Sequence, residues 1–213
     1  EDVTGEDRTL GENGYKEVVL TGIHLSSYGI DFDKERHLLD LIRAVHQIEG
    51  IERIRLGSLE PGIITEEFAE AISKLPKMCP HFHLSLQSGC NATLKRMNRR
   101  YTSEEYAERC GILRKYFENP ALTTDVIVGF PGETEEEFEA SRNFVDSIDF
   151  YETHIFKYSR TEGAKEAVMP DQVSEGKKSA RSAEMIEMGE QKRRAYEESF
   201  IGKEVEVLVE EEI

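Results

Sequence analysis

The stretch TTDVIVGFPGET, residues 123–134, constrains the fold more than any other part of the chain. An apolar run with the length of a buried strand leads through a glycine-proline turn into an acidic helix start. Thr134 and Glu137 have the spacing of a capping box, while Gly129 and Gly132 allow a flat ligand to approach the backbone. Because open α/β sheets bind ligands beyond the carboxyl ends of their strands, the segment fits a nucleoside site or a plain strand-turn-helix connection.

Short apolar runs alternate with amphipathic segments from Tyr15 onward, a pattern typical of repeated β-α units and a parallel sheet. The predicted strands cover residues 17–20, 53–56, 82–86, 123–128 and 153–158. The predicted helices cover residues 37–47, 66–73, 103–116, 135–147 and 173–200. In a parallel barrel the loops after the strands share one face, so they together build one site. The fold class is therefore predicted as α/β, with parallel strands.

Residues 204–210, EVEVLVE, alternate strictly between charged and apolar side chains, which predicts a half-buried antiparallel strand. A single strand does not fold alone, so this segment is interpreted as the opening of a further β domain. The predicted organisation is a barrel core over residues 1–200 and the first strand of a second domain over residues 201–213.

The formal net charge of −16 argues against a broad phosphate-binding face, so any grip on nucleic acid must be local or lie elsewhere. The three cysteines, Cys79, Cys90 and Cys110, form no CxxC pair and make a poor disulfide framework, which favours a reducing cytoplasm. No run approaches the length of a membrane span, and no secretory leader opens the chain, so no membrane contact is expected.

Several polar residues at predicted strand ends have two readings. Asp125 in a buried strand costs free energy unless it is paired, so it is either a site residue or bonded to a neighbouring strand loop, and the site role is favoured. Gln87 and Ser88 suit either ribose hydroxyls and a carboxylate or the capping of the next helix. A basic cluster next to a predicted loop suits carboxylate or phosphate pairing, or else a solvated helix end; its members are Lys95, Arg96, Arg99 and Arg100.

The histidines do not predict a metal centre. His81 and His83 flank Phe82 and face one side of the sheet together, but no third ligand stands at a suitable spacing. His24, in the loop after the first strand, suits a ligand contact or an ordinary structural hydrogen bond. The sequence therefore predicts no metal held by these side chains.

Five blocks carry a family resemblance in the right order over about 150 residues: TGIHLSSYG, GSLEP, HLSLQSGCNATLKRMNRRY, TTDVIVGFPGET and FKYSRTEGAKEA. The set resembles the methylthiotransferase family of radical S-adenosylmethionine (SAM) enzymes. Within that family, TGIHLSSYG and SLEP resemble the branch that modifies N6-threonylcarbamoyladenosine in tRNA. The branches that modify isopentenyladenosine in tRNA, or an aspartate of a ribosomal protein, differ in the first loop.

The resemblance implies a partial, TIM-like (β/α) barrel that opens SAM beside a [4Fe–4S] cluster, with a second such cluster elsewhere in the protein. It implies a transferase that installs a methylthio group at C2 of an adenosine beside the anticodon, with the tRNA anticodon loop as partner and a sulfur donor that the sequence does not identify. It also implies that the C-terminal strand opens a small, TRAM-like β-barrel that binds RNA, which would explain the acidic balance of the rest.

The resemblance further implies which residues surround SAM. One loop approaches the methionine amino group, a second lies near the ribose or the carboxylate, and the glycine-proline turn with the last strand shapes and closes the adenine slot. In that order the residues are Thr21, Gly22 and Ile23; Gln87 and Ser88; Gly129, Phe130, Pro131, Gly132 and Glu133 with Phe156 and Tyr158. Arg99 or Arg100 would pair with the methionine carboxylate.

Two departures from the family pattern stand out. The CxxxCxxC motif that holds the SAM cluster is missing, and the three cysteines are too widely spaced to replace it, so this polypeptide by itself is expected to be inactive. Residues 1–7 and 8–14 resemble segments from either side of the cluster loop, which suggests residues missing between Asp7 and Arg8. A methylthiotransferase for a different acceptor, and a noncatalytic barrel that binds SAM or a nucleotide, are the alternatives.

Overall fold

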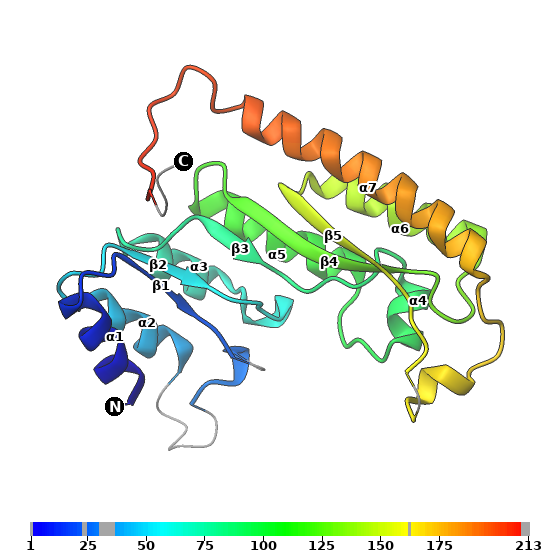
Figure 1. Ribbon diagram of the computed structural model, residues 1–213, viewed down its shortest axis with the longest axis horizontal. Helices are drawn as coiled ribbons and strands as arrows, with labels where there is room; N and C mark the ends of the chain where they lie inside the picture. Colours follow the sequence, from blue (N-terminus) through cyan, green and yellow to red (C-terminus); the bar gives the residue numbers. More distant parts are fainter. Residues whose placement is uncertain (1, 23–24, 30–36, 162, 210–213) are drawn as a thin grey trace.

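The computed structural model describes residues 2–22, 25–29, 37–161 and 163–209, in which helices and parallel strands alternate (Figure 1). The elements, in chain order, are α1 (Asp2–Glu12), β1 (Glu17–Leu20), α2 (Leu38–His46), β2 (Arg53–Leu56), α3 (Glu66–Ser73), β3 (His81–His83), α4 (Asn91–Arg96), α5 (Ser103–Tyr116), β4 (Ala121–Val128), α6 (Glu135–Ile148), β5 (Glu152–Lys157) and α7 (Glu175–Glu198). Short 3-10 helices cover Leu25–Ser27, Pro61–Ile63 and Lys165–Val168.

The strands form two parallel sheets that isolated bridges join. β1 pairs with β2, and β3, β4 and β5 pair in that order, with every pairing parallel. Parallel bridges at Ile54–Met78 and Leu59–Leu84 join the two groups, and the Leu59 N–H donates to the His83 carbonyl at 2.9 Å. The predicted α/β class with parallel strands is therefore confirmed.

The two faces of β4 differ in burial. Val126 and Val128 are buried in the hydrophobic core, together with Tyr106 of α5 and Phe138 of α6. Figure 1 shows α5 and α6 behind these strands, while α7 runs beside β5. Asp125 and Ile127 alternate with the buried valines and remain partly exposed on the opposite face. We call this the open face of the sheet.

The acidic helix start after β4 forms as predicted. The Thr134 hydroxyl accepts the Glu137 N–H at 3.2 Å, and the Glu137 carboxylate accepts the Thr134 N–H at 3.2 Å, which completes a capping box. β4 and β5 each lie within one or two residues of their predicted limits. β3 ends sooner than predicted, because Gln87 adopts a left-handed backbone with φ of 72° and the chain pairs there only through isolated bridges.

The N-terminal residues form a helix that the sequence patterns did not reveal. Asp7 and Arg8 both lie inside α1, and the Thr9 hydroxyl donates to the Gly5 carbonyl across that point at 3.0 Å. The helix is continuous across this point, and the expectation that residues are missing between Asp7 and Arg8 stays a prediction. The predicted domain limits stay a prediction.

The predicted strand over residues 204–210 is wrong for the described part, residues 204–209. These residues carry no regular structure and are exposed. Alternation stabilises a strand only when a neighbouring strand accepts its backbone hydrogen bonds and covers its apolar side, and none of the described strands does so here.

Candidate functional site

The turn after β4 is held by its own backbone and side chains. Gly129 and Gly132 have φ values of 73° and 78°, a region that favours glycine. The Gly129 N–H donates to the Glu133 carboxylate at 2.7 Å, and the Gly132 N–H donates to the Asp171 carbonyl at 2.9 Å. The turn is therefore a fixed edge at the carboxyl end of β4.

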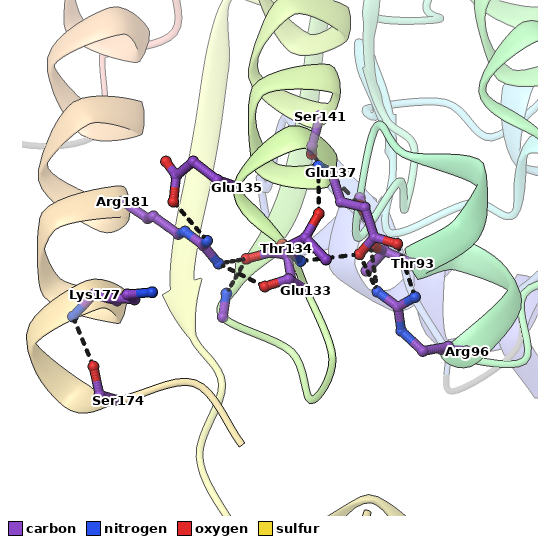
Figure 2. A network of polar contacts seen from close by, with 12 residues as sticks. Thr93, Arg96, Glu133, Thr134, Glu135, Glu137, Ser141, Ser174, Lys177 and Arg181 are labelled. Carbon is purple, nitrogen blue, oxygen red and sulfur yellow. Dashed lines mark hydrogen bonds and ion pairs between the residues drawn. The ribbon is translucent and has the colours of Figure 1, made fainter. Parts of the chain in front are cut away.

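Glu133 anchors this turn to α7 (Figure 2). Arg181 donates to the Glu133 carboxylate at 2.7 Å and to the Glu133 carbonyl at 3.2 Å, and it also pairs with Glu135 at 3.0 Å. Burial raises the pKa of Glu133, although the Gly129 N–H and Arg181 favour its charged form. Glu133 thus shapes the turn from within, and sequence reasoning gave no signal for its partner on a distant helix.

Lys178 of α7 fills the space beside Gly129. A side chain at position 129 would collide with the Lys178 Cγ, so close packing requires glycine here. The expected approach of a ligand to this backbone stays a prediction. The Lys178 ammonium donates to the Tyr158 carbonyl at 2.9 Å and lies 5.3 Å from the centre of the Tyr158 ring. It also pairs with Glu175 at 2.7 Å.

An apolar pocket of about 280 Å³ opens beside the turn, on the open face of the sheet. Its walls include Ile127, Phe130, Phe156 and Tyr158. Phe130 and Tyr158 meet edge to face with their ring centres 5.4 Å apart, while the Phe156 ring is half exposed. Three residues predicted to form an adenine slot are therefore brought together, and a flat aromatic group is the ligand that such walls suit.

A polar cleft of about 690 Å³ adjoins this pocket and shares Lys157, Tyr158 and Ser159 with it. Its other walls include Arg160 and Gln172, whose side chains are joined by a 3.1 Å hydrogen bond. An apolar pocket next to a polar, basic cleft suits a ligand with an aromatic base and hydrophilic substituents.

The two predicted arginines lie elsewhere. Arg99 and Arg100 are exposed and line a separate cleft of about 370 Å³ with Glu60 and Tyr101. The Tyr101 hydroxyl lies 2.8 Å from the carbonyls of both Ser85 and Leu86, and burial raises its pKa to about 12. The structure does not bring the arginines to the apolar pocket, because they follow α4 rather than β4 or β5.

The remaining predicted residues have mainly structural contacts. Ser88 is fully buried, and its hydroxyl accepts the Cys90 N–H at 3.2 Å and lies 3.5 Å from the Ser141 hydroxyl. Gln87 exchanges backbone hydrogen bonds with β4. Pro131 is buried in the turn, and Thr21 and Gly22 are exposed at the end of β1. Ile23 and His24 lie outside the described residues.

Asp125 lies on the open face beside a histidine of the neighbouring strand. Its carboxylate oxygen is 3.4 Å from the His83 Nε2, and this contact lowers the pKa of Asp125. The carboxylate is therefore paired with a neighbouring strand and partly exposed, and its role in a site stays a prediction.

The cysteines do not fit an iron–sulfur cluster. Cys79 and Cys110 are buried in or beside the core, and Cys90 is partly buried next to the start of α4. Burial raises the pKa of Cys110 to about 12, which keeps it a thiol, whereas clusters are held by thiolates. Within the described residues, no set of cysteines converges on one point.

The comparison with protein families shows which superfamily the chain belongs to. The model of the Radical SAM superfamily matches residues 3–145, most of the chain. The chain belongs to the radical SAM superfamily. The cofactors of that superfamily are SAM and the [4Fe–4S] cluster. The described residues of this radical SAM chain contain no set of cysteines that could hold the cluster.

Curated relatives of this radical SAM chain carry methylthiotransferase names, which confirms the resemblance found in the sequence. The threonylcarbamoyladenosine tRNA methylthiotransferase MtaB of Bacillus subtilis is 41% identical over 99% of the chain and 47% of its own length. The tRNA-2-methylthio-N(6)-dimethylallyladenosine synthase of Thermoanaerobacter pseudethanolicus is also 41% identical, over 99% of the chain and 45% of its own length. The chain spans about half the length of the curated relatives it matches.

Solved structures support the fold. Coproporphyrinogen III oxidase (HemN) from Escherichia coli, a radical SAM enzyme, matches 90% of the chain and 46% of its own with a TM-score of 0.65 and 14% identity. The radical SAM methyltransferase TsrM from Kitasatospora setae, bound to cobalamin and a [4Fe–4S] cluster, matches 75% of the chain and 31% of its own with a TM-score of 0.61 and 18% identity. None of the described helices combines the length and the apolar character that crossing a bilayer requires.

Proposed function

We propose that the chain is the barrel portion of a tRNA methylthiotransferase that converts N6-threonylcarbamoyladenosine next to the anticodon into its 2-methylthio derivative. One observation carries this proposal: 41% identity, over 99% of the chain, to a relative named for that reaction. The sequence blocks TGIHLSSYG and SLEP, which resemble the same branch, support the choice of nucleoside.

The geometry favours SAM as the ligand of the apolar pocket and the adjoining cleft. Phe130, Phe156 and Tyr158 would flank the adenine, and the polar cleft would take hydrophilic parts of the molecule. Arg181 of α7 binds the turn at Glu133, and Lys178 of the same helix packs against Gly129, so contacts within the protein order the turn. Such pre-ordering lowers the entropic cost of binding.

Thr21, Gly22 and Ile23 after β1, and Gln87 after β3, belong to the loops at the same barrel end in this proposal, and they would approach the methionine and the ribose. Ser88 would act through the backbone, since its hydroxyl is already engaged. Arg99 and Arg100 would face the methionine carboxylate or the RNA from their separate cleft.

We place the ligands of both clusters outside these 213 residues, in the rest of a protein about twice as long. The chain alone would then be inactive, as expected from the missing cysteine motif. The net charge of −16 fits a tRNA contact made mainly by other parts of the protein. The reaction would take place in the cytoplasm, where its tRNA substrate is found.

A second candidate keeps the chemistry and changes the nucleoside to dimethylallyladenosine. It is favoured by the equal 41% identity to a relative named for that product. A methylthiotransferase for a protein aspartate would be a third acceptor class, and a noncatalytic barrel would make no product at all.

The nucleosides of tRNA from cells with and without the parent gene test the proposal. Digestion and mass spectrometry are expected to show loss of 2-methylthio-N6-threonylcarbamoyladenosine, its unmodified precursor rising instead, and recovery when the gene is restored. Loss of the dimethylallyl product alone would establish the second candidate. An unchanged tRNA with an altered ribosomal protein would establish the third acceptor class, and no change in either would contradict the proposed reaction.

A further inference from the structure

The open face of the sheet gathers two histidines and an aspartate from three neighbouring strands. Asp125 of β4 stands opposite His154 of β5, and His83 of β3 stands opposite Thr123, two residues before Asp125. Parallel register therefore brings together residues that are far apart in the sequence. The nitrogen and oxygen atoms that His83, Asp125 and His154 offer all lie within 4.8 Å of one another.

The spacing of these atoms is close to that of a coordination sphere. The His83 Nε2 and the Asp125 carboxylate oxygen are 3.4 Å apart. Two ligands at about 2.0–2.1 Å from a tetrahedral ion lie about 3.4 Å from each other. The rings of His83 and His154 are stacked, with centres 5.9 Å apart and planes 23° from parallel. His154 is exposed, so its ring is not held in one orientation by the core.

A residue on the neighbouring strand β4 already orients His83. Its Nδ1 lies 3.0 Å from the hydroxyl of Thr123, which is buried. When Nδ1 donates that hydrogen bond, Nε2 presents a lone pair, as in metal sites where a second interaction fixes the ring. The His83 Nε2 is buried, and its nearest polar contact given for the described residues is the Asp125 carboxylate at 3.4 Å, which does not meet hydrogen-bond geometry. A metal ion would satisfy this atom.

We propose that His83, Asp125 and His154 bind one divalent transition metal ion, most suitably zinc, with at least one coordination position left open. Two imidazoles and one carboxylate are ligands typical of zinc and of other first-row transition ions, whereas magnesium and calcium favour sites made of oxygen. Three protein ligands leave room for water or a substrate atom. This site is separate from the iron–sulfur clusters and does not depend on the proposed methylthiolation.

The site also neighbours the apolar pocket. Ile127 and Phe156, which line the pocket, are the next pair on the same face after Asp125 and His154. A metal ion at His83, Asp125 and His154 would therefore lie along the open face from the pocket, where a bound ligand could reach its open position.

Cobalt titration of the 213-residue chain tests the proposal. The chain is freed of metal with a chelator, and Co²⁺ is added while visible absorption is recorded. We expect saturation at one Co²⁺ per chain, bands of a nitrogen and oxygen environment without thiolate charge transfer, and displacement by Zn²⁺. His154→Gln and Asp125→Asn should each weaken binding by about tenfold or more, and His37→Gln, outside the site, should leave it unchanged.

The His154 variant keeps the test decisive, since an exposed side chain can be replaced without disturbing the core. Circular dichroism and the thermal midpoint verify the fold of each variant. The proposal is overturned by an absence of saturable Co²⁺ binding, by binding that all three variants retain equally, or by thiolate bands that disappear when the cysteines are replaced.

Discussion

Arg181 of α7 and Glu133 of the turn after β4 form an ion pair with both side chains almost fully buried, 5% and 1% exposed, and with 2.7 Å between Nη1 and Oε2. The pair ties the edge of the apolar pocket to the last helix, so the shape of the pocket depends on a contact far along the chain. Removing one partner leaves a buried charge without compensation, which costs far more than the net value of the pair.

Arg181→Met is therefore expected to lower the free energy of unfolding by about 3–5 kcal/mol, measured by urea titration. The exposed pair of Arg142 in α6 and Glu184 in α7 is the matched control, with side chains 41% and 47% exposed. Arg142→Met should change stability by less than about 1 kcal/mol. The double variant Arg181→Met with Glu133→Gln should recover part of the loss. Equal effects of the two arginine variants would contradict this reading.

Two helical glycines should respond in opposite ways to alanine. A Cβ at Gly189 of α7 would lie 2.6 Å from the Thr153 hydroxyl of β5, whereas a Cβ at Gly111 of α5 meets no atom within 4 Å. Gly111→Ala should stabilise the chain by about 0.5–1 kcal/mol, because alanine is the better helix former. Gly189→Ala should destabilise it by about 1–3 kcal/mol through overpacking. The thermal midpoints of both variants measure these changes. Stabilisation by Gly189→Ala would show that α7 does not pack closely on β5.

Acid should weaken the contact between α4 and α6. Arg96 lowers the pKa of Glu137 below its usual value of 4.5, and Thr134 and Thr93 also hydrogen-bond its carboxylate. Because the pKa in the folded chain is lower than in the unfolded chain, this stabilisation is present above about pH 4.5 and is lost as the pH falls through the lowered value.

Urea midpoints between pH 6 and pH 3 measure this effect. Wild type should lose about 1–2 kcal/mol more than Arg96→Met over that range, because protonation of Glu137 breaks an ion pair that the variant does not have. Parallel acid profiles for the two proteins would show that Arg96 does not stabilise the ionised carboxylate.

The cysteines should differ sharply in alkylation. Cys79 and Cys110 are buried with raised pKa values, so at pH 8 only about one in ten thousand Cys110 thiols is ionised, even where reagent has access. Iodoacetamide followed by peptide mass spectrometry should label Cys90 alone in the native chain and all three cysteines in urea. Rapid native labelling of Cys110 would mean that α5 does not pack as described.

The order of strands and helices could be predicted because apolar periodicity reflects burial locally. Residues 123–128 read as a strand in any context, and Thr134 with Glu137 marks the helix start. α1 was missed because Gly5 and Gly11 interrupt a segment with few apolar residues. The C-terminal alternation misled for the opposite reason, since a strand also needs a partner that local sequence does not supply.

The site was predictable only in part. Phe130, Phe156 and Tyr158 could be assigned to one pocket through the family resemblance, and the structure brings the three side chains together. Arg181 and Lys178 could not, because the docking of α7 is a tertiary event without a local pattern. His83 and Asp125 were singled out from the sequence, but His154 was not. The meeting of the three side chains depends on strand register, whereas the expectation that no third ligand exists rested on spacing along the chain.

The most direct test of the central claim is the formation of a 2-methylthio nucleoside by the complete protein, reconstituted with iron and sulfide without oxygen and supplied with SAM, a reductant and tRNA lacking the modification. Nucleoside mass spectrometry is expected to find 2-methylthio-N6-threonylcarbamoyladenosine with wild type. The Phe156→Ala variant, with equal iron and sulfide content, should form at least about tenfold less of this nucleoside, because the substitution removes one wall of the pocket. A wild-type protein with full clusters that forms no 2-methylthio nucleoside would contradict the account.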